Sequence, residues 1–253
     1  MLASAAAIAI WMSGPAAGQG VLPGDLVYLR DVDPSIIQDI RYATSNNFVG
    51  RPLPGYDAPE CILRRAVAAA LRRVQTDLAA SGLSLKVYDC YRPTRAVRAM
   101  AQWAGNGRSP GATKRFFPNL PKNQLFALGY IAARSKHSTG IAVDLTMVET
   151  GHARVAAFDP RAAYGPCTGP AAARAPDTSI DMGTGFDCLD VLSHTASPAI
   201  RGEARRHRDL LVAAMARRGF RNYHREWWHF EYAAAAPVAY YDAPIRARAA
   251  SPD

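Results

Sequence analysis

Two short segments of the chain combine histidine with carboxylate side chains in apolar surroundings. In the first, SKHSTGIAVD (residues 135–144), His137 and Asp144 are seven residues apart with Gly140 between them. Because glycine tolerates the backbone angles of tight turns, the chain can reverse there and bring a residue before the turn to one on the next strand. A carboxylate is costly to bury unless it is paired or binds a metal. His137 and Asp144 are therefore candidate ligands of one metal ion.

The second segment, EWWHFE (residues 226–231), again places a histidine beside carboxylates in an aromatic run. His229 can supply a third ligand, and three protein ligands are typical of a catalytic zinc site, whose fourth tetrahedral position stays open. Such a site needs a further carboxylate that moves protons without binding the metal, which suits Glu226. In an ideal strand residues 226 and 229 point to opposite faces, so we expect a bulge or a bend between them.

The elements that position these segments follow from the spacing of apolar residues. The pattern predicts helices over residues 61–81, 93–104, 124–133 and 205–217, strands over 83–88 and 141–147, and one or two strands over 220–232. Short strands mixed with unequally spaced helices indicate an α+β fold rather than a regular βαβ repeat. Residues 149–187 are rich in Gly, Pro and Ala, and we expect a mobile loop there within a single domain.

Composition excludes several classes of protein. Of the 253 residues, 49% are hydrophobic and 20% charged, which is typical of a globular protein and not of a disordered chain. The net charge is +9, but the basic residues are scattered, whereas a nucleic-acid-binding surface would gather them on one face. Beyond the N-terminus no apolar run approaches the roughly 20 residues of a membrane span. We therefore expect neither a nucleic-acid partner nor a membrane span.

The N-terminal segment predicts export. Residues 1–12 form an apolar run, and the small residues that follow include Ala16-Ala17-Gly18, a fitting cleavage site. This pattern is typical of a signal peptide over residues 1–20, and the alternative is a disordered tail. Residues 21–253 then form the mature domain, in a periplasmic or secreted protein.

The four cysteines bear on the same question. They do not form a CxxC pair, and an even number of cysteines in an exported protein favours disulfides. Local pairing, of Cys61 with Cys90 and of Cys167 with Cys188, is the simplest of the three possible arrangements. Four reduced and buried thiols are the alternative.

Together, SKHSTGIAVDLT and EWWHFEY resemble the zinc D-Ala-D-Ala dipeptidases of the vancomycin-resistance dipeptidase family. The segments IRYATSNNFVGRPLPGY, VYDCYRPTRAV and MGTGFDCLD agree, so the similarity runs from about Leu29 to about Asp242. These enzymes belong to the wider group of zinc D,D-peptidases and are similar in fold to the hedgehog signalling domain. The resemblance implies a small, mostly antiparallel sheet flanked by helices.

The resemblance also implies roles for residues of the catalytic centre. His137, Asp144 and His229 would bind one Zn²⁺ ion per chain. Glu226 would be the catalytic base and acid, and Arg92, in the YRP segment, would stabilise the developing oxyanion. An arginine fork suits an oxyanion well because its donors are fixed in a plane.

Other matched positions concern the substrate. Asp187, in the GFD segment, would hold the substrate ammonium, with help from Ser135 and Tyr42, and Asp89 would support Arg92. The chain departs from the family at Cys90, where glycine is frequent.

The resemblance implies zinc-dependent hydrolysis of the small dipeptide D-Ala-D-Ala to two D-Ala, in the turnover or recycling of peptidoglycan precursors. A loop insertion at about residues 149–180 is longer than a minimal member needs and lies near the expected substrate end. One alternative is a D,D-carboxypeptidase that acts on longer stem peptides. Another is a binding module that holds zinc without catalysis, although such a module needs neither Glu226 nor Arg92.

Overall fold

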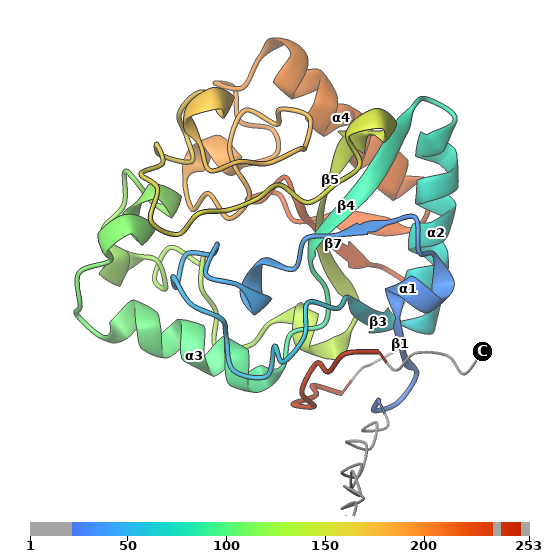
Figure 1. Cartoon of the computed structure of the whole chain (residues 1–253), viewed down its shortest axis with the longest axis horizontal. Helices are drawn as coiled ribbons and strands as arrows, with labels where there is room; N and C mark the ends of the chain where they lie inside the picture. The colour runs from blue at the N-terminus through green and yellow to red at the C-terminus, as the bar shows by residue number, and fades with distance from the viewer. Residues whose placement is uncertain (1–21, 235–238, 249–253) are drawn as a thin grey trace, which may run out of the picture.

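A five-stranded mixed sheet runs through the middle of the protein (Figure 1). Its strands lie in the order β2-β4-β5-β7-β6, with β2 parallel to β4 and the other neighbouring pairs antiparallel. Strands β1 and β3 form a separate antiparallel pair. The strands are β1 (Leu26–Tyr28), β2 (Ile37–Gln38), β3 (Ile62–Arg64), β4 (Leu83–Asp89), β5 (Ala142–Glu149), β6 (Phe220–Asn222) and β7 (His229–Tyr232).

Four α-helices and several short 3₁₀ helices complete the fold of the residues that the structure describes. The α-helices are α1 (Leu29–Val32), α2 (Arg65–Ala79), α3 (Thr94–Gly105) and α4 (Gly202–Ala216). The 3₁₀ helices are η1 (Arg41–Ala43), η2 (Gly111–Phe116), η3 (Lys122–Gln124), η4 (Lys136–Thr139), η5 (Thr150–His152), η6 (Ala171–Ala173) and η7 (Val191–Ser193). Helix α2 contacts both β4 and α4, and α4 contacts β6. The expected α+β domain with a small, mostly antiparallel sheet and flanking helices is confirmed.

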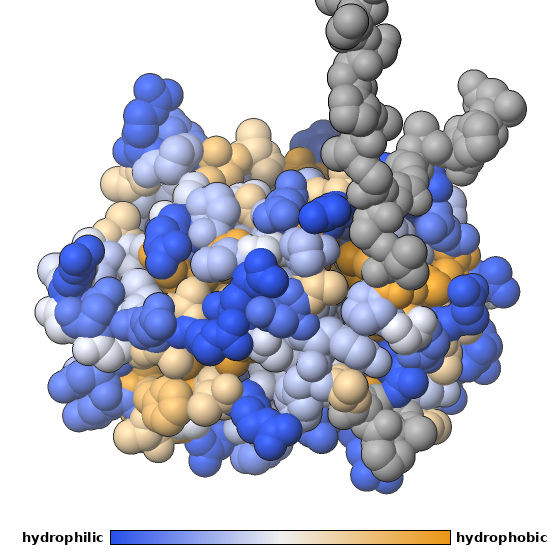
Figure 2. Space-filling model, turned by 90° about the horizontal axis from the view of Figure 1, so that it is seen from below, coloured by the Kyte–Doolittle hydropathy of each residue, from blue (hydrophilic) through white to orange (hydrophobic). Residues whose placement is uncertain are grey.

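This computed structural model describes residues 22–234 and 239–248, so the expected signal peptide lies outside the described residues. In these two ranges none of the helices combines the length and the hydropathy that a membrane crossing needs. Hydrophilic side chains are dispersed over the face shown in Figure 2 rather than gathered in one region.

Two of the predicted helices differ from the observed structure. The helix predicted over 61–81 begins at Arg65, because residues 62–64 pair with β1 as strand β3. The helix predicted over 124–133 is wrong: its first residue ends η3, and turns follow. Gly129 has a φ of +77° there, in the left-handed region that no right-handed helix contains.

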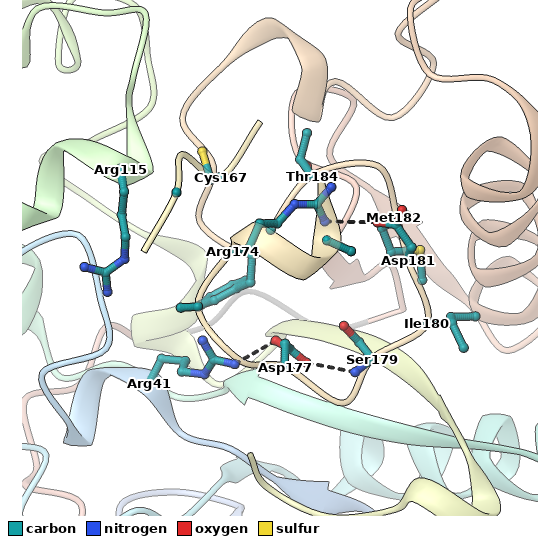
Figure 3. A pocket seen from close by; sticks show the side chains of 15 residues that line it. Arg41, Arg115, Cys167, Arg174, Asp177, Ser179, Ile180, Asp181, Met182 and Thr184 are labelled. Carbon is teal, nitrogen blue, oxygen red and sulfur yellow. Dashed lines mark hydrogen bonds and ion pairs between the residues drawn. The ribbon is translucent and has the colours of Figure 1, made fainter. Parts of the chain in front are cut away.

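The long segment after β5 contains no strand, but it is tied to the rest of the fold. The structure pairs Cys167 with Cys188, which lie at either end of its second half. Asp177 reaches β4 and η1: Lys86 and Tyr88 of β4 and Arg41 of η1 all donate to its carboxylate. Figure 3 shows Arg41 directed at this carboxylate. The segment expected as a mobile loop is thus anchored by a disulfide and by buried ion pairs.

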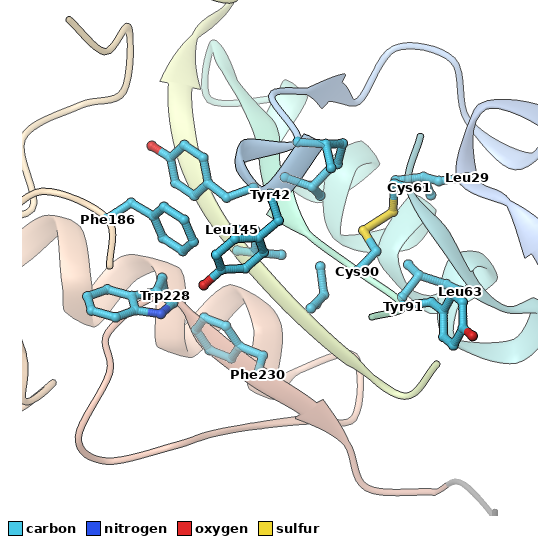
Figure 4. Packing of buried hydrophobic residues seen from close by; sticks show 14 of the residues in the cluster. Leu29, Tyr42, Cys61, Leu63, Cys90, Tyr91, Leu145, Phe186, Trp228 and Phe230 are labelled. Carbon is cyan, nitrogen blue, oxygen red and sulfur yellow. A yellow bond between two sulfur atoms is a disulfide. The ribbon is translucent and has the colours of Figure 1, made fainter. Parts of the chain in front are cut away.

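The hydrophobic core lies between the sheet and the elements around it (Figure 4). Leu145, in the middle of β5, is fully buried, and Phe186 and Trp228 pack edge to face. A second disulfide joins Cys61, just before β3, to Cys90, just after β4, as the local pairing predicted. Both disulfides therefore lie against buried parts of the fold.

Candidate active site

One cavity of about 210 Å³ is lined by all the residues predicted as metal ligands, catalytic groups or substrate contacts. These predicted residues are Tyr42, Arg92, Ser135, His137, Asp144, Asp187, Glu226 and His229. Within the described part of the chain, His137, Asp144 and His229 form a group suited to a metal ion, with one donor atom from each lying within 4.8 Å of the others.

Neighbouring strands bring this group together. Asp144 on β5 lies opposite His229, the first residue of β7, and opposite Asp89 at the end of β4 on the other side. His137 comes from η4, which ends at Gly140 with a φ of +74°. A Cβ atom at Gly140 would collide with the side chain of Leu26, so the turn into β5 requires glycine.

Three donor atoms converge at the centre of the site. His137 Nε2 lies 3.2 Å from Asp144 Oδ1 and 3.1 Å from His229 Nδ1, and the Asp144 Oδ1 to His229 Nδ1 distance is 2.9 Å. Ligands bound at zinc–nitrogen distances of about 2.0–2.1 Å would stand about 3.3 Å apart in a tetrahedron. The three atoms thus already approximate one face of a coordination tetrahedron.

The outer nitrogens of both histidines meet acceptors. His137 Nδ1 donates to the carbonyl oxygen of Cys90 over 2.7 Å, and His229 Nε2 lies 3.6 Å from a carboxylate oxygen of Glu231. With protons on these outer nitrogens, two imidazole lone pairs and the Asp144 carboxylate all face one point. Only a cation satisfies such a donor set, so the residues present fit a metal ion.

The pKa values at the centre reflect the same concentration of negative charge. Burial alone would raise the pKa of Asp144, but His137 and His229 hold it well below its ordinary value. Burial lowers the pKa of His229, yet its contacts with Asp144 and Glu231 outweigh that and raise it to about 10. The cluster therefore attracts positive charge.

Glu226 stands next to this centre without joining it. Its side chain lies 3.9 Å from His229 Nδ1. The expected change of direction between residues 226 and 229 is a turn that precedes β7, in which the N–H of His229 donates to the Glu226 carbonyl. Burial raises the pKa of Glu226 to about 7, with Asp144 adding to the rise and His229 and Arg92 opposing it. A carboxyl group with a pKa near neutrality can both accept and return a proton.

Arg92 borders the cleft beside the cluster. Its Nε and Nη2 atoms lie 2.9 and 2.7 Å from Asp89 Oδ2, and Nη2 lies 3.6 Å from Asp144 Oδ2. The guanidinium carbon also lies 4.8 Å from the centre of the Tyr42 ring. Asp89 in turn accepts a 2.6 Å hydrogen bond from the hydroxyl of Tyr56. Asp89 thus holds Arg92 in place, the position that the resemblance implied for it.

Asp187 and Tyr42 line the same cavity and contact each other; we call this pair the substrate end of the cleft, and the group of His137, Asp144 and His229 its metal end. The Tyr42 hydroxyl lies 2.8 and 3.1 Å from the two oxygens of Asp187 and donates to this carboxylate. Asp187 has a φ of +57°, the left-handed value that a non-glycine residue adopts at a cost. Burial, and then the charge of Asp144, raise the pKa of Asp187 well above its ordinary value. Ser135 borders the same cavity, but its side chain accepts the N–H of His137 and caps η4.

The contributors missed in the sequence include the carbonyl of Cys90 and the carboxylate of Glu231. The first left no signal, since any residue carries a carbonyl. The second could have been found, because residues 229 and 231 of one strand point to the same face.

Comparisons with known proteins identify the family to which the sequence belongs. The sequence matches the family described as D-Ala-D-Ala dipeptidase over residues 24–158 and 174–249, so residues 159–173 of the expected insertion lie outside the match. It is 36% identical over 228 residues to the D-alanyl-D-alanine dipeptidase of Streptomyces coelicolor, covering 88% of this chain and 100% of that one. It is 31% identical over 207 residues to the enzyme of the same name from Enterococcus faecalis, covering 81% and 90%. A solved structure titled "VanYB in complex with D-Alanine-D-Alanine" superposes with a TM-score of only 0.34 at 13% identity, over 69% of this chain and 73% of that chain.

Proposed function

This chain belongs to the D-Ala-D-Ala dipeptidase family, and from that premise we propose how its cleft hydrolyses D-Ala-D-Ala to two molecules of D-Ala. The observation that carries the proposal is the convergence of His137 Nε2, Asp144 Oδ1 and His229 Nδ1 beside a carboxylate, Glu226, that stays outside the cluster. Metal ligands and a separate proton carrier are the two parts that metal-assisted hydrolysis needs.

His137, Asp144 and His229 would hold Zn²⁺, because two imidazole nitrogens and a carboxylate oxygen are typical ligands of a catalytic zinc. A zinc ion bound there would supply Lewis acidity, which polarises a peptide carbonyl and lowers the pKa of a water molecule. Side chains of the protein would transfer the protons, stabilise the oxyanion and bind the substrate.

Glu226 would accept the proton of the attacking water on its carboxylate. It would then donate that proton to the nitrogen of the leaving D-Ala. The side chain is nearly enclosed, with 15% of its surface exposed, so bulk water competes little for the proton. This role requires that Glu226 remain unbound to the metal.

Arg92 would stabilise the negative charge that develops on the carbonyl oxygen of the scissile bond. Its guanidinium group is already held by Asp89, and its side chain is 11% exposed at the cavity wall. A charge fixed before the reaction stabilises a transition state without having to reorganise.

Asp187 would bind the ammonium group of the dipeptide, with Tyr42 orienting its carboxylate. A buried carboxylate selects a free amine, because an acylated substrate brings no charge and leaves Asp187 unpaired. Ser135, which lines the same cavity, would help Asp187 to hold the ammonium group. The cleft would thereby select substrates by the length of the peptide on the amino side of the scissile bond.

We further propose a periplasmic or secreted location and a role in the turnover of peptidoglycan precursors. The two disulfides support it, because such bonds persist in oxidising compartments. The apolar N-terminal segment expected to be a signal peptide points the same way.

A product assay with zinc-loaded protein tests the proposal. Free D-Ala-D-Ala, its N-acetylated form and a longer stem peptide that ends in D-Ala-D-Ala are compared, with Glu226→Gln as the inactive control. We expect release of D-Ala from the free dipeptide and little from the other two. Equal cleavage of the stem peptide would favour the D,D-carboxypeptidase, and binding without cleavage would favour the zinc-holding module.

A further inference from the structure

The two histidines of the cluster face it with different nitrogens. His137 presents Nε2 and His229 presents Nδ1. A neutral imidazole has one lone pair, so His137 must carry its proton on Nδ1 and His229 must carry its proton on Nε2 if both bind a metal. The carbonyl of Cys90 secures the first of these protons over 2.7 Å. The second needs an acceptor of its own.

We propose that Glu231 is the positioning residue that fixes the metal-binding tautomer of His229 by accepting its Nε2 proton. This inference rests on the proposed function, because it requires a metal ion at the cluster. Glu231 Oε1 lies 3.6 Å from His229 Nε2, on the side of the ring that faces away from Asp144. Carboxylates that hold the outer nitrogen of a metal-bound histidine orient the ring and raise its basicity.

The strand itself explains why Glu231 is in place. His229 and Glu231 are two residues apart on β7, so the pleat sends both side chains to one face. In the neighbouring strand Asp144 lies opposite His229, and Ala142 lies opposite Glu231. Ala142 is a small residue, so this position leaves room for the glutamate to reach back along the strand towards His229.

Other partners for Glu231 stand close by without forming an ion pair with it. Arg221 lies opposite Glu231 in β6, and Lys136 lines a shallow hollow together with both residues. Within the described residues, the ion pair of Glu231 is nevertheless with His229. The glutamate is thus engaged with the metal ligand and not with the surface cations.

The zinc dissociation constant of Glu231→Ala, measured with a competing chelator, tests this role. We expect zinc to bind about 10–100-fold more weakly, with the melting temperature of the metal-free protein unchanged. Glu231→Gln keeps an acceptor without the charge and should fall between Glu231→Ala and the wild type. The matched control is Glu149→Ala, which removes the 3.0 Å contact of an exposed glutamate with His152 at the far end of β5. It should leave zinc affinity unchanged.

Nitrogen NMR of the zinc-loaded wild type, labelled on histidine, gives a readout that needs no variant. One metal-bound histidine should carry its proton on Nδ1 and the other on Nε2. Two metal-bound histidines of the same tautomer, or a Glu231→Ala protein that binds zinc within twofold of the wild type, would overturn the role of Glu231 alone. If the wild type binds zinc no better than His229→Ala, the proposed function itself fails, and this inference fails with it.

Discussion

The two ends of the cleft are held in place by different kinds of structure. At the metal end, Asp144 and His229 come from neighbouring strands, and the register of β5 and β7 sets them opposite each other. At the substrate end, Tyr42 comes from η1, and Asp187 comes from the long connection between β5 and α4. Backbone hydrogen bonds of a sheet therefore fix the first end, whereas side-chain contacts between distant segments fix the second.

Three contacts hold the connection that carries Asp187. Cys188, the next residue, is bonded to Cys167. Phe186, the preceding residue, stacks on Tyr88 of β4 with ring centres 4.3 Å apart. Earlier in the same segment, Asp177 pairs with Arg41, the neighbour of Tyr42. These contacts hold Asp187 in its strained left-handed conformation. None of the three involves a metal ligand, so changes at the substrate end should disturb Asp187 without loss of the metal.

The largest effect on activity is expected at the metal end, where the role of the catalytic base can be tested separately from that of a metal ligand. Glu226→Gln should lower kcat by about 10²–10⁴-fold while zinc stays stoichiometric, because only the proton carrier is lost. His229→Ala should lose zinc itself. Metal content and kcat measured on the same preparations check this. Near-full turnover by Glu226→Gln would remove Glu226 from the mechanism.

The metal end could be predicted from the sequence, and the substrate end only in part. Two short apolar segments contain His137, Asp144, His229 and Glu226. Histidine and carboxylate side chains in such surroundings indicate a metal site. Asp187 was found through the resemblance, because nothing in its local sequence distinguishes a binding aspartate from one that caps a turn. The contacts of Asp177 with η1 and β4 join residues more than 85 positions apart, and no local pattern encodes such a pairing.

Removing the ion pairs of Asp177 should lower the free energy of unfolding strongly and leave zinc binding nearly unchanged. Asp177→Asn should cost about 3 kcal/mol, because it leaves the buried charge of Lys86 without its ion pair and Arg41 with Asp39 alone. Urea unfolding measures this cost. The exposed pair of Asp159 with Arg161 supplies the control, since Asp159→Asn should cost well under 1 kcal/mol.

The same variant should change how stability depends on pH. Burial would raise the pKa of Asp177, but Arg41 and Lys86 hold it well below its ordinary value. A lowered pKa stabilises the folded state fully above the ordinary value of about 3.9, and this contribution is lost as the pH falls below it. Asp177→Asn should therefore lose less stability than the wild type on acidification. Parallel curves for the two proteins would contradict the buried pairing.

The two disulfides offer a direct comparison of the two ends. Replacing either pair of cysteines by serine should cost about 3 kcal/mol, since they close loops of similar length, 29 and 21 residues. The functional effects should differ. Loss of the Cys61–Cys90 bond should weaken zinc binding, because the Cys90 carbonyl holds His137. Loss of the Cys167–Cys188 bond should raise KM, because Cys188 follows Asp187.

Zinc affinity and KM, measured on both serine double variants under conditions where each is folded, check this contrast. Identical changes in the two variants would show that the ends are not independent. Free thiols in the exported, unreduced wild type would contradict both pairings.

A smaller effect is expected when the proposed ammonium ligand is removed. Asp187→Ala should lower kcat/KM on free D-Ala-D-Ala by about tenfold to a hundredfold, as expected for losing one buried charged partner. Activity on N-acetyl-D-Ala-D-Ala should change little, so the gap between the two substrates should narrow. A variant that loses activity on both substrates equally would assign Asp187 a structural role.

The smallest effect concerns two buried tyrosines that donate to two buried aspartates. Tyr42 donates to Asp187 at the substrate end, and Tyr56 donates to Asp89 at the metal end. Their rings are neighbours, with centres 5.9 Å apart, so phenylalanine at either position removes one hydroxyl from almost the same surroundings. Each loss should cost about 1 kcal/mol, or roughly fivefold, because one hydrogen bond is removed. Tyr42→Phe should raise KM by this factor, since Asp187 is proposed to bind the ammonium group of the substrate in the ground state. Tyr56→Phe should instead lower kcat by this factor, since Asp89 holds Arg92, which is proposed to stabilise the developing oxyanion. If both variants change the same kinetic constant, the division of the cleft into a metal end and a substrate end is wrong.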